Sequence, residues 1–398
     1  MKTMSIGEAS ELLGRRKEVD PLFRGRVAHI IETVRTGDDA ALRGLAAWLN
    51  DPEPRELTLS GASNLIGEAT ECILRKSLKN ISSFAAKTAE AAVPFQIDYG
   101  THKAGLRWEP VTVAGCYVPG GRFPLASSAL MTISAARAAG VRKVIVCSPD
   151  SSTTTLAACE IAGADAFFNV GGAQAIAAMA FGTKTIPRAD VIAGPGNSWV
   201  TEAKRQLQGY VGIDMIAGPS EVALVVDGTS CARQAAADLL AQTEHDIEAT
   251  AWCISADACK LTEISAALEK TGNTGEIRMV IAESVKDVAD LCNMLAPEHL
   301  QLSTANPCGI KSLFTSYGAL FLGEGTPVPL GDYAAGPNHT LPTGGSARFS
   351  GGLTPFAFLR PQGWVRNYGG ELPLLAGDFA SLEGLRGHEE ACRLRCST

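Results

Sequence analysis

Several features that would assign a class to this protein are missing from its sequence. Apolar runs of about 18 residues, the length that crosses a bilayer, do not occur, and this argues against a membrane-spanning helix. The first 20 residues also lack the apolar core of a signal peptide. Acidic residues outnumber basic ones by 42 to 35, so nucleic acids and anionic membranes are disfavoured as partners.

Cysteine spacing is equally restrictive. The 11 cysteines are odd in number and contain no C-x-x-C pair, which rules out the usual zinc-ribbon spacings. We expect reduced, mostly buried thiols in a cytoplasmic protein. Any bound metal should therefore be held by histidine, carboxylate and amide ligands.

What the sequence does contain is an alternation of two patterns. Short apolar runs that end in glycine or proline, such as "KVIVCSP" and "ADVIAGPGN", are separated by alanine-rich stretches such as "TTTLAACEIAG". Strands that alternate with helices predict parallel sheets covered on both faces, so the fold class is α/β with two Rossmann-like lobes. In such sheets ligands bind beyond the carboxyl ends of the strands, where these glycine turns lie.

The same alternation suggests how the chain is divided. We expect an inserted α/β lobe over residues 117–220, within a second α/β lobe built from 21–116 and 221–353. Residues 1–20 are expected to form an N-terminal helical segment. Residues 354–398 lose the strand rhythm after "GGSARFSGG" and predict a helical tail. A tail this short cannot bury a core of its own, so it needs another surface to pack on.

Dinucleotide binding is permitted by the sequence without being required by it. The G-x-G-x-x-G fingerprint is absent. The glycine turns could cradle a phosphate with backbone N–H groups at helix starts, or they could be ordinary strand-to-helix loops.

Polar candidates gather in the second half of the chain. Gln242 and His245 are three residues apart in "QTEH", on one face of an expected helix, where they could bind a metal or simply cap the helix. Glu298 and His299 follow an apolar helical run, and a carboxylate beside an imidazole can activate water and accept protons. A solvated helix end is the alternative explanation for that pair.

Two further stretches carry histidine near a carboxylate. Asp332 and His339 lie in "GDYAAGPNHT", whose glycine, proline and asparagine content predicts a loop. Glu383 and His388 lie in the tail, where histidines are usually solvated.

Taken together, these stretches make the chain resemble the histidinol dehydrogenase family. The resemblance rests on eight motifs in the family's order: "GCYVPGG", "GGAQAIAAMAFGT", "GPGNSWVTEAKRQL", "IDMIAGPSE", "QTEH", "APEHLQL", "GDYAAGPNHTLPTGGSARFSG" and "LEGLRGH". It implies a zinc- and NAD-dependent enzyme that oxidises L-histidinol to L-histidine through the aldehyde, in the last steps of histidine biosynthesis.

The resemblance also implies residue roles. Zinc ligands fall on four positions: Gln242, His245, Asp332 and His388. This donor set suits Zn²⁺ and is also compatible with Mn²⁺. Catalysis falls on His299, which takes the alcohol proton, and on Glu298, which activates the water that adds to the aldehyde.

The remaining implied contacts concern the two small molecules. NAD contacts map onto Tyr117, Gln174 and Asn197. Substrate contacts map onto the four zinc ligands and His299, and further onto Ser220, His339 and Glu383. The family also implies a homodimer in which each tail completes its partner's zinc site.

Some features depart from the family pattern and leave the substrate open. The segment between His245 and Glu298 is short, and "GCYVPGGRFPLASSALM" and "YGALFLG" are similar to a paralogous branch that oxidises other small alcohols, including sulfonated diols. Another amino alcohol or (sulfo)polyol is therefore the alternative substrate. A non-catalytic metal- or ligand-binding protein is the alternative of another class, and it would not need the Glu298–His299 pair.

Overall fold

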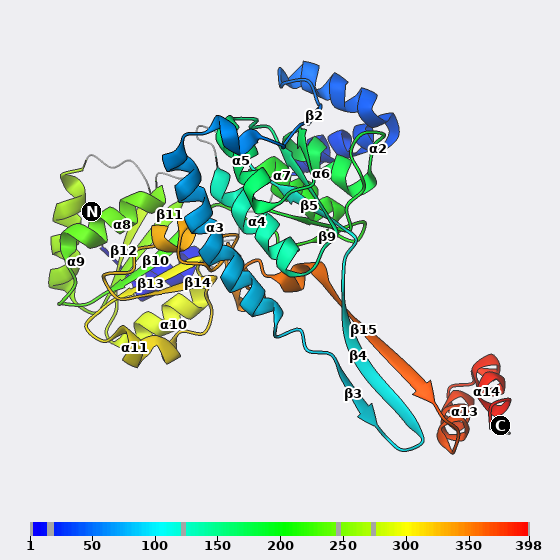
Figure 1. The fold of residues 1–398 in the computed structure, drawn as a ribbon. Coiled ribbons are helices and arrows are strands. Elements are labelled where there is room, and N and C mark those ends of the chain that lie inside the picture. Colours follow the sequence, from blue (N-terminus) through cyan, green and yellow to red (C-terminus); the bar gives the residue numbers. More distant parts are fainter. Residues whose placement is uncertain (1–2, 14–19, 121–124, 244–247, 272–275, 397–398) are drawn as a thin grey trace.

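The computed structural model describes residues 3–13, 20–120, 125–243, 248–271 and 276–396. Within these ranges the strands form two six-stranded sheets, here named sheet A and sheet B, and a three-stranded antiparallel sheet that extends from them as an arm (Figure 1). None of the helices in the described ranges is both long enough and apolar enough to cross a bilayer.

Sheet A consists of strands that are all parallel to their neighbours. In spatial order they are β1 (Thr3–Ser5), β12 (Glu276–Ile281), β11 (Thr250–Ser255), β10 (Glu221–Val226), β13 (His299–Ser303) and β14 (Ala319–Leu322). Apolar side chains cover both faces, because central strands such as "VALVV" are apolar on each side. One face packs on α8 (Ala232–Thr243) and α9 (Ala258–Glu269), the other on α1 (Ile6–Leu13) and α10 (Val285–Leu295).

Sheet B has the strand order of a doubly wound fold. Its strands are β2 (Glu56–Leu57), β7 (Ala166–Asn169), β6 (Lys143–Ser148), β5 (Val113–Tyr117), β8 (Val191–Ala193) and β9 (Gly212–Ile213), with β2 alone antiparallel. One face is covered by α2 (Pro21–Leu49), α6 (Gly172–Phe181) and α7 (Ser198–Leu207), the other by α3 (Glu68–Ala89), α4 (Ala126–Ala138) and α5 (Thr153–Ala162). The two parallel-sheet lobes predicted from the sequence are thereby confirmed.

The expected division of the chain needs one correction. The apolar stripe of α2 (Val27, Ile30, Ile31 and Val34) is buried in the core that also contains α6, and β2 pairs with β7. The first part of 21–116 thus belongs to the lobe of sheet B, because the apolar stripe of α2 is buried against the apolar face formed by α6 and sheet B. The N-terminal segment is not purely helical either, since β1 adds a strand to the edge of sheet A beside β12.

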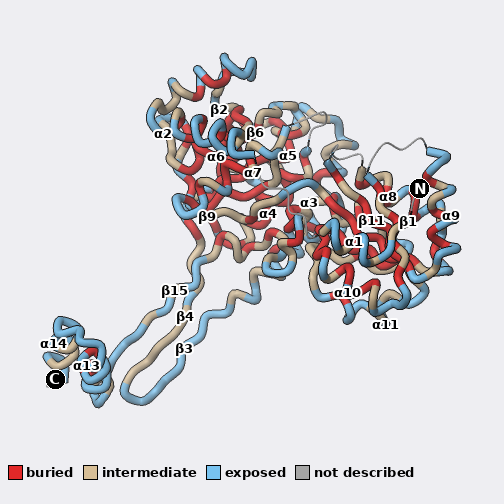
Figure 2. The backbone as a smooth tube through the Cα atoms, turned by 180° about the vertical axis from the view of Figure 1, so that it is seen from behind, coloured by how far each residue is buried: buried red, intermediate tan, exposed pale blue. Residues whose placement is uncertain are grey.

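The tail also differs from its expectation as purely helical. Residues Leu359–Asn367 form strand β15, which pairs along its whole length with β4 (His102–Pro110), and β3 (Phe95–Asp98) completes the arm. Its pairing joins residues roughly 250 positions apart, which a local pattern cannot reveal. The arm carries α13 (Leu372–Leu382) and α14 (Arg386–Arg393) away from both sheets (Figures 1 and 2).

The link between the sheets determines which of their edges are neighbours. The chain leaves sheet B at the carboxyl end of β9 and enters sheet A at the amino end of β10, with only residues 214–220 between them. The carboxyl edge of sheet B is therefore joined to the amino edge of sheet A. The remaining short helices are η1 (Ala62–Leu65), α11 (Pro307–Ile310), η2 (Lys311–Leu313), α12 (Pro329–Tyr333), η3 (Ser346–Arg348) and η4 (Pro355–Phe358).

Candidate active site

Glu298 and His299 lie at the amino edge of sheet A. Helix α10 ends at Leu295, and His299 is the first residue of β13, so the pair is not the end of a helix as the sequence suggested. Both side chains are buried, with His299 Nδ1 3.7 Å from Glu298 Oε2. The solvated alternative is excluded by this burial. In sheet A the candidate residues thus lie at the amino edge and not at the carboxyl ends where the sequence analysis expected ligands, because the chain enters β10 and β13 from the side that faces sheet B.

Asp332 approaches the same histidine from the other side. It lies in the short helix α12 and not in an open loop, and its Oδ1 is 3.7 Å from His299 Nε2. Gly331 permits this approach, because a Cβ there would meet the ring of Phe321 at 2.7 Å. Burial alone would lower the pKa of His299, but the Glu298 and Asp332 carboxylates outweigh it and raise that pKa above its usual value.

A second buried glutamate adjoins the cluster. Glu221 opens strand β10, its backbone N–H donates to Glu298 Oε2 over 3.0 Å, and its carboxylate accepts from the Gly344 N–H over 2.9 Å. Burial, together with the nearby Glu298 carboxylate, raises the pKa of Glu221 to about 7. Burial likewise raises the pKa of Glu298, against the effect of His299 and of a hydrogen bond from Ser220. Ser220 thus lies in the cluster.

His339 connects the two lobes. Its Nδ1 lies 3.0 Å from the Asp332 carbonyl, and its Nε2 lies 3.4 Å from the hydroxyl of Ser128 on α4. Neighbouring Asn338 donates to the carbonyl of Met131, also on α4, over 2.9 Å. The stretch after Asp332 therefore crosses from sheet A to the helices of sheet B.

Gln242 lies in the last turn of α8, also toward the amino edge of sheet A. Four residues earlier on the same helix, Asp238 accepts a 2.7 Å hydrogen bond from Gln301 on β13, two residues after His299. Helix and strand run in opposite directions, so Gln242 continues this row toward His299. It is 3% exposed, and its Nε2 has no hydrogen-bond partner among the described residues. His245 lies outside the described residues.

Glu383 and His388 are not brought to this cluster within one chain. Glu383 follows α13 and His388 belongs to α14, both exposed at the far end of the arm (Figure 2). The helices around them also expose large apolar side chains. These are Leu374, Leu375, Phe379, Leu382, Leu385 and Leu394.

The three expected cofactor residues lie at or just after the carboxyl ends of strands in sheet B. Tyr117 ends β5, and its hydroxyl accepts a 3.0 Å hydrogen bond from Gly172 N–H at the start of α6. Gln174 is buried in the first turn of that helix. Asn197 caps α7 by accepting from the Trp199 N–H and is exposed. The glycine turns of sheet B thus meet the expected edge.

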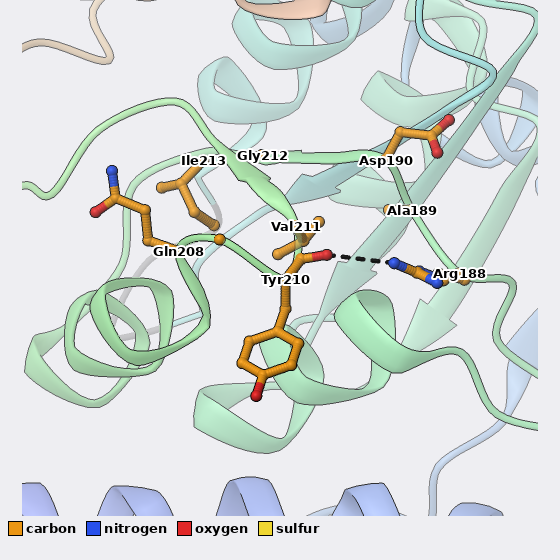
Figure 3. A pocket seen from close by; sticks show the side chains of 9 residues that line it. Arg188, Ala189, Asp190, Gln208, Tyr210, Val211, Gly212 and Ile213 are labelled. Carbon is orange, nitrogen blue, oxygen red and sulfur yellow. Dashed lines mark hydrogen bonds between the residues drawn. The ribbon is translucent and has the colours of Figure 1, made fainter. Parts of the chain in front are cut away.

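Two surface pockets accompany sheet B. One is small and lies at the carboxyl edge, where Gln174 is joined by Asp51, 3.4 Å from its Nε2, and by Pro149. The other, of about 380 Å³, lies beside the residues that lead into β8 and β9 (Figure 3). Arg188 there donates to the Tyr210 carbonyl over 3.3 Å. This second pocket is at the amino edge, opposite the cofactor residues, and contains none of the predicted site residues.

A divalent cation fits part of the residue set predicted to hold it. Buried Gln242 and Asp332 supply an amide and a carboxylate at one edge of sheet A, a donor chemistry that suits zinc. The amide nitrogen without a partner in the described ranges is consistent with an amide whose oxygen faces an ion. Within those ranges of one chain, no three His, Cys, Asp or Glu side chains gather as metal ligands, since His388 lies on the arm.

Some buried charged groups near the site were not predicted from the sequence. Glu221 is one of them, although a carboxylate that opens an otherwise apolar strand is a usable signal. Lys204 and Asp214 form a buried ion pair beneath the turn before Asn197. Thiols were expected to be mostly buried, but of the 11 free cysteines five are buried and five are exposed.

The protein is a two-lobed α/β protein. A buried Glu–His–Asp cluster lies at the edge of sheet A, and the glycine turns of sheet B lie at the facing edge, an arrangement that indicates an enzyme. The sequence profile described as Histidinol dehydrogenase matches residues 14–396. A curated histidinol dehydrogenase from Prochlorococcus marinus is 39% identical over 93% of this chain and 89% of its own length, and one from Thermus thermophilus is 38% identical over 94% and 95%. The crystal structure of histidinol dehydrogenase from Elizabethkingia anophelis superposes with a TM-score of 0.90 at 29% identity, covering 99% of this chain and 97% of that one. The chain belongs to the histidinol dehydrogenase family.

Proposed function

We propose that this protein oxidises L-histidinol to L-histidine through the aldehyde, with two NAD molecules and one water. The observation that carries the proposal is the buried Glu298–His299–Asp332 cluster, which lies where sheet A is joined to the cofactor edge of sheet B. A protein that only binds ligands would not need a buried histidine between two carboxylates. The free thiols of the chain favour the cytoplasm as its compartment.

His299 and Glu298 divide the proton transfers. His299, between two carboxylates, accepts the hydroxyl proton as the first hydride leaves the alcohol carbon. Glu298 takes a proton from water as that water adds to the aldehyde carbonyl, and the hydrate then loses the second hydride. Burial favours both steps, because an aldehyde held away from bulk solvent reacts before it escapes. Bound NAD would supply the hydride acceptor in each half of the reaction.

The other residues bind and orient. Tyr117, Gln174 and Asn197 hold NAD at the carboxyl edge of sheet B, and Ser220, His339 and Glu383 contact the substrate. Gln242, His245, Asp332 and His388 hold zinc, with Mn²⁺ as the alternative ion. An ion held there would supply a positive charge that helps to orient the substrate.

The test of this function is the appearance of NADH absorbance when purified protein meets L-histidinol and NAD. We expect activity that a chelator removes and added zinc restores. Activity with a sulfonated diol or another amino alcohol, and none with histidinol, would place the protein in the paralogous branch. Zinc and NAD binding without NADH formation from any of these alcohols would identify a binding protein.

We further propose a homodimer in which the tail of each copy completes the site of the other. Glu383 and His388 lie at the end of the arm, apart from Asp332 of the same chain, and the exposed leucines of α13 need a surface to cover them (Figures 1 and 2). A second copy supplies the surface on which the tail packs, and its own Asp332 cluster receives Glu383 and His388 from that tail.

Subunit mixing tests the shared site. Gln242→Ala and His388→Ala are each expected to be inactive. After subunit exchange in equal amounts, activity should return to about a quarter of wild type, because half of the dimers are mixed and each has one intact site. Sites built within single chains would keep one lesion each, and no activity would return.

A further inference from the structure

A buried ion pair lies beneath the turn that leads to Asn197. Lys204 on α7 and Asp214, just after β9, approach to 2.6 Å between Nζ and Oδ1. Their side chains are 4% and 0% exposed, so neither can touch a ligand in the cleft. Taking two charges out of water is costly, and replacing such a pair with apolar residues often leaves stability unchanged or improved. Net stability is therefore a weak explanation for this pair.

Both partners also bind the backbone of a single residue. Lys204 Nζ donates to the Gly194 carbonyl over 2.6 Å, and Asp214 Oδ2 accepts from the Gly194 N–H over 2.8 Å. The pair thus holds both polar backbone groups of the first residue after β8. Charge-assisted hydrogen bonds of this length are short and directional, so they fix the orientation of that peptide.

Gly194 links the ion pair to the cofactor residues. Its φ of +125° is in a region that favours glycine, and a Cβ there would lie 2.1 Å from the carbonyl oxygen of Tyr117. Three residues later Asn197 begins α7 as its cap, accepting from the Trp199 N–H over 3.1 Å. The orientation of Gly194 therefore sets both the backbone that Tyr117 packs against and the path of the chain to Asn197.

We propose that Lys204 and Asp214 are a positioning pair for NAD, which holds the 194–197 turn against Tyr117 in the geometry that the cofactor binds. The proposal rests on the function proposed above, in which Tyr117 and Asn197 contact NAD. The pair acts through the turn and touches neither cofactor nor substrate. Its loss should weaken NAD binding while leaving the cluster on sheet A intact.

The test uses a double variant, Lys204→Met with Asp214→Asn, which removes both charges and leaves no unpaired ion in the core. NAD affinity is measured by calorimetry on the full-length protein without substrate. We expect NAD to bind about tenfold or more weakly, since a small misplacement of contact groups has effects of this size. Bound zinc, measured by elemental analysis, should stay at the wild-type level, and KM for NAD should rise more than kcat falls.

Arg205→Met is the matched control. Arg205 neighbours Lys204 on α7 and pairs with buried Glu202 over 2.7 Å from its Nε, and Gln206 on the same helix is a further hydrogen-bond partner of Glu202. NAD affinity should be unchanged in this variant. Equal affinity in wild type and a folded double variant would overturn the proposal, as would an equal loss in Arg205→Met.

Folding and function are separated by two further measurements. If thermal unfolding shows that the double variant does not fold, Lys204→Gln is measured in its place, because glutamine keeps a hydrogen-bond donor toward Gly194. Wild-type NAD affinity in Lys204→Gln would also contradict a role for the charge pair. Absence of NAD binding by the wild-type protein would refute the proposed function itself, whereas weakened binding in Asn197→Ala with normal binding in the double variant refutes the positioning pair alone.

Discussion

Replacing Glu221 by glutamine should stabilise the protein, and only at neutral to alkaline pH. The Glu221 carboxyl is 9% exposed and faces Glu298, and its pKa is raised from 4.5 to about 7. The folded protein therefore holds this proton more tightly than the unfolded chain does. The free energy of unfolding falls as the pH rises through this interval, and the stabilisation is fully present only below the unfolded pKa.

The size of the stabilisation follows from the difference between the unfolded and the folded pKa of Glu221. At about 1.4 kcal/mol for each pKa unit, ionised Glu221 costs the folded state about 3 kcal/mol above its folded pKa. Glutamine has the shape of the protonated acid, and its oxygen can still accept from the Gly344 N–H. We expect Glu221→Gln to exceed wild type by up to about 3 kcal/mol at about pH 8.5, and by less than about 1 kcal/mol near pH 5.

Urea unfolding of metal-free protein, followed by circular dichroism at the two pH values, measures this difference. Glu202→Gln is the matched control, because Glu202 is also buried but hydrogen bonds from Arg205 and Gln206 outweigh burial and lower its pKa. That variant should lose stability at the higher pH. A gain in Glu221→Gln that does not depend on pH, or no gain at all, would refute the reasoning about Glu221.

Three further outcomes are expected. Glu298→Gln should slow oxidation of the aldehyde more than that of the alcohol, and His299→Asn should slow the alcohol half at least as much; equal losses in both halves for Glu298→Gln, measured with each substrate, would contradict the water-activating role. His388→Asn should lower bound zinc in elemental analysis without changing the circular dichroism spectrum, and unchanged zinc would remove His388 from the ligand set. Gly194→Ala should destabilise the protein by roughly 3 kcal/mol or more in urea unfolding, because its Cβ meets the Tyr117 carbonyl, and wild-type stability would show that the turn can shift.

The sequence was sufficient to predict most of the central strands and the presence of two parallel sheets. Runs such as "VALVV" in β10 and "KVIVCS" in β6 are apolar on both faces, and the glycine turns after β7 and β8 lie at the expected edge. The local apolar pattern determines these strands, so they can be predicted from short stretches of sequence. Glu298 and His299 could also be selected as candidates from the sequence, because their motif is short and continuous.

What the sequence could not reveal depends on distant parts of the chain. Strand β15 exists because it pairs with β4, and nothing in "LRPQGWVRN" alternates clearly enough to show it. The cluster lies at the amino edge of sheet A because residues 214–220 enter β10 there. This depends on how the two sheets are connected, which amino-acid composition does not show. The Lys204–Asp214 pair can be recognised only once both residues are placed in space.

The joining of a carboxyl edge to an amino edge also brings opposite helix ends to the junction of the two sheets. Helices α6 and α7 begin at the edge of sheet B, at Gly172 and Ser198, whereas α8 and α10 end at the edge of sheet A, at Thr243 and Leu295. Each helix start carries roughly half a positive unit charge and each helix end roughly half a negative one. The edge of sheet B therefore favours phosphates, and the edge of sheet A favours cations. In the proposed reaction, this separation would let a spent dinucleotide leave the positive edge and be replaced while the half-oxidised substrate stays at the negative one.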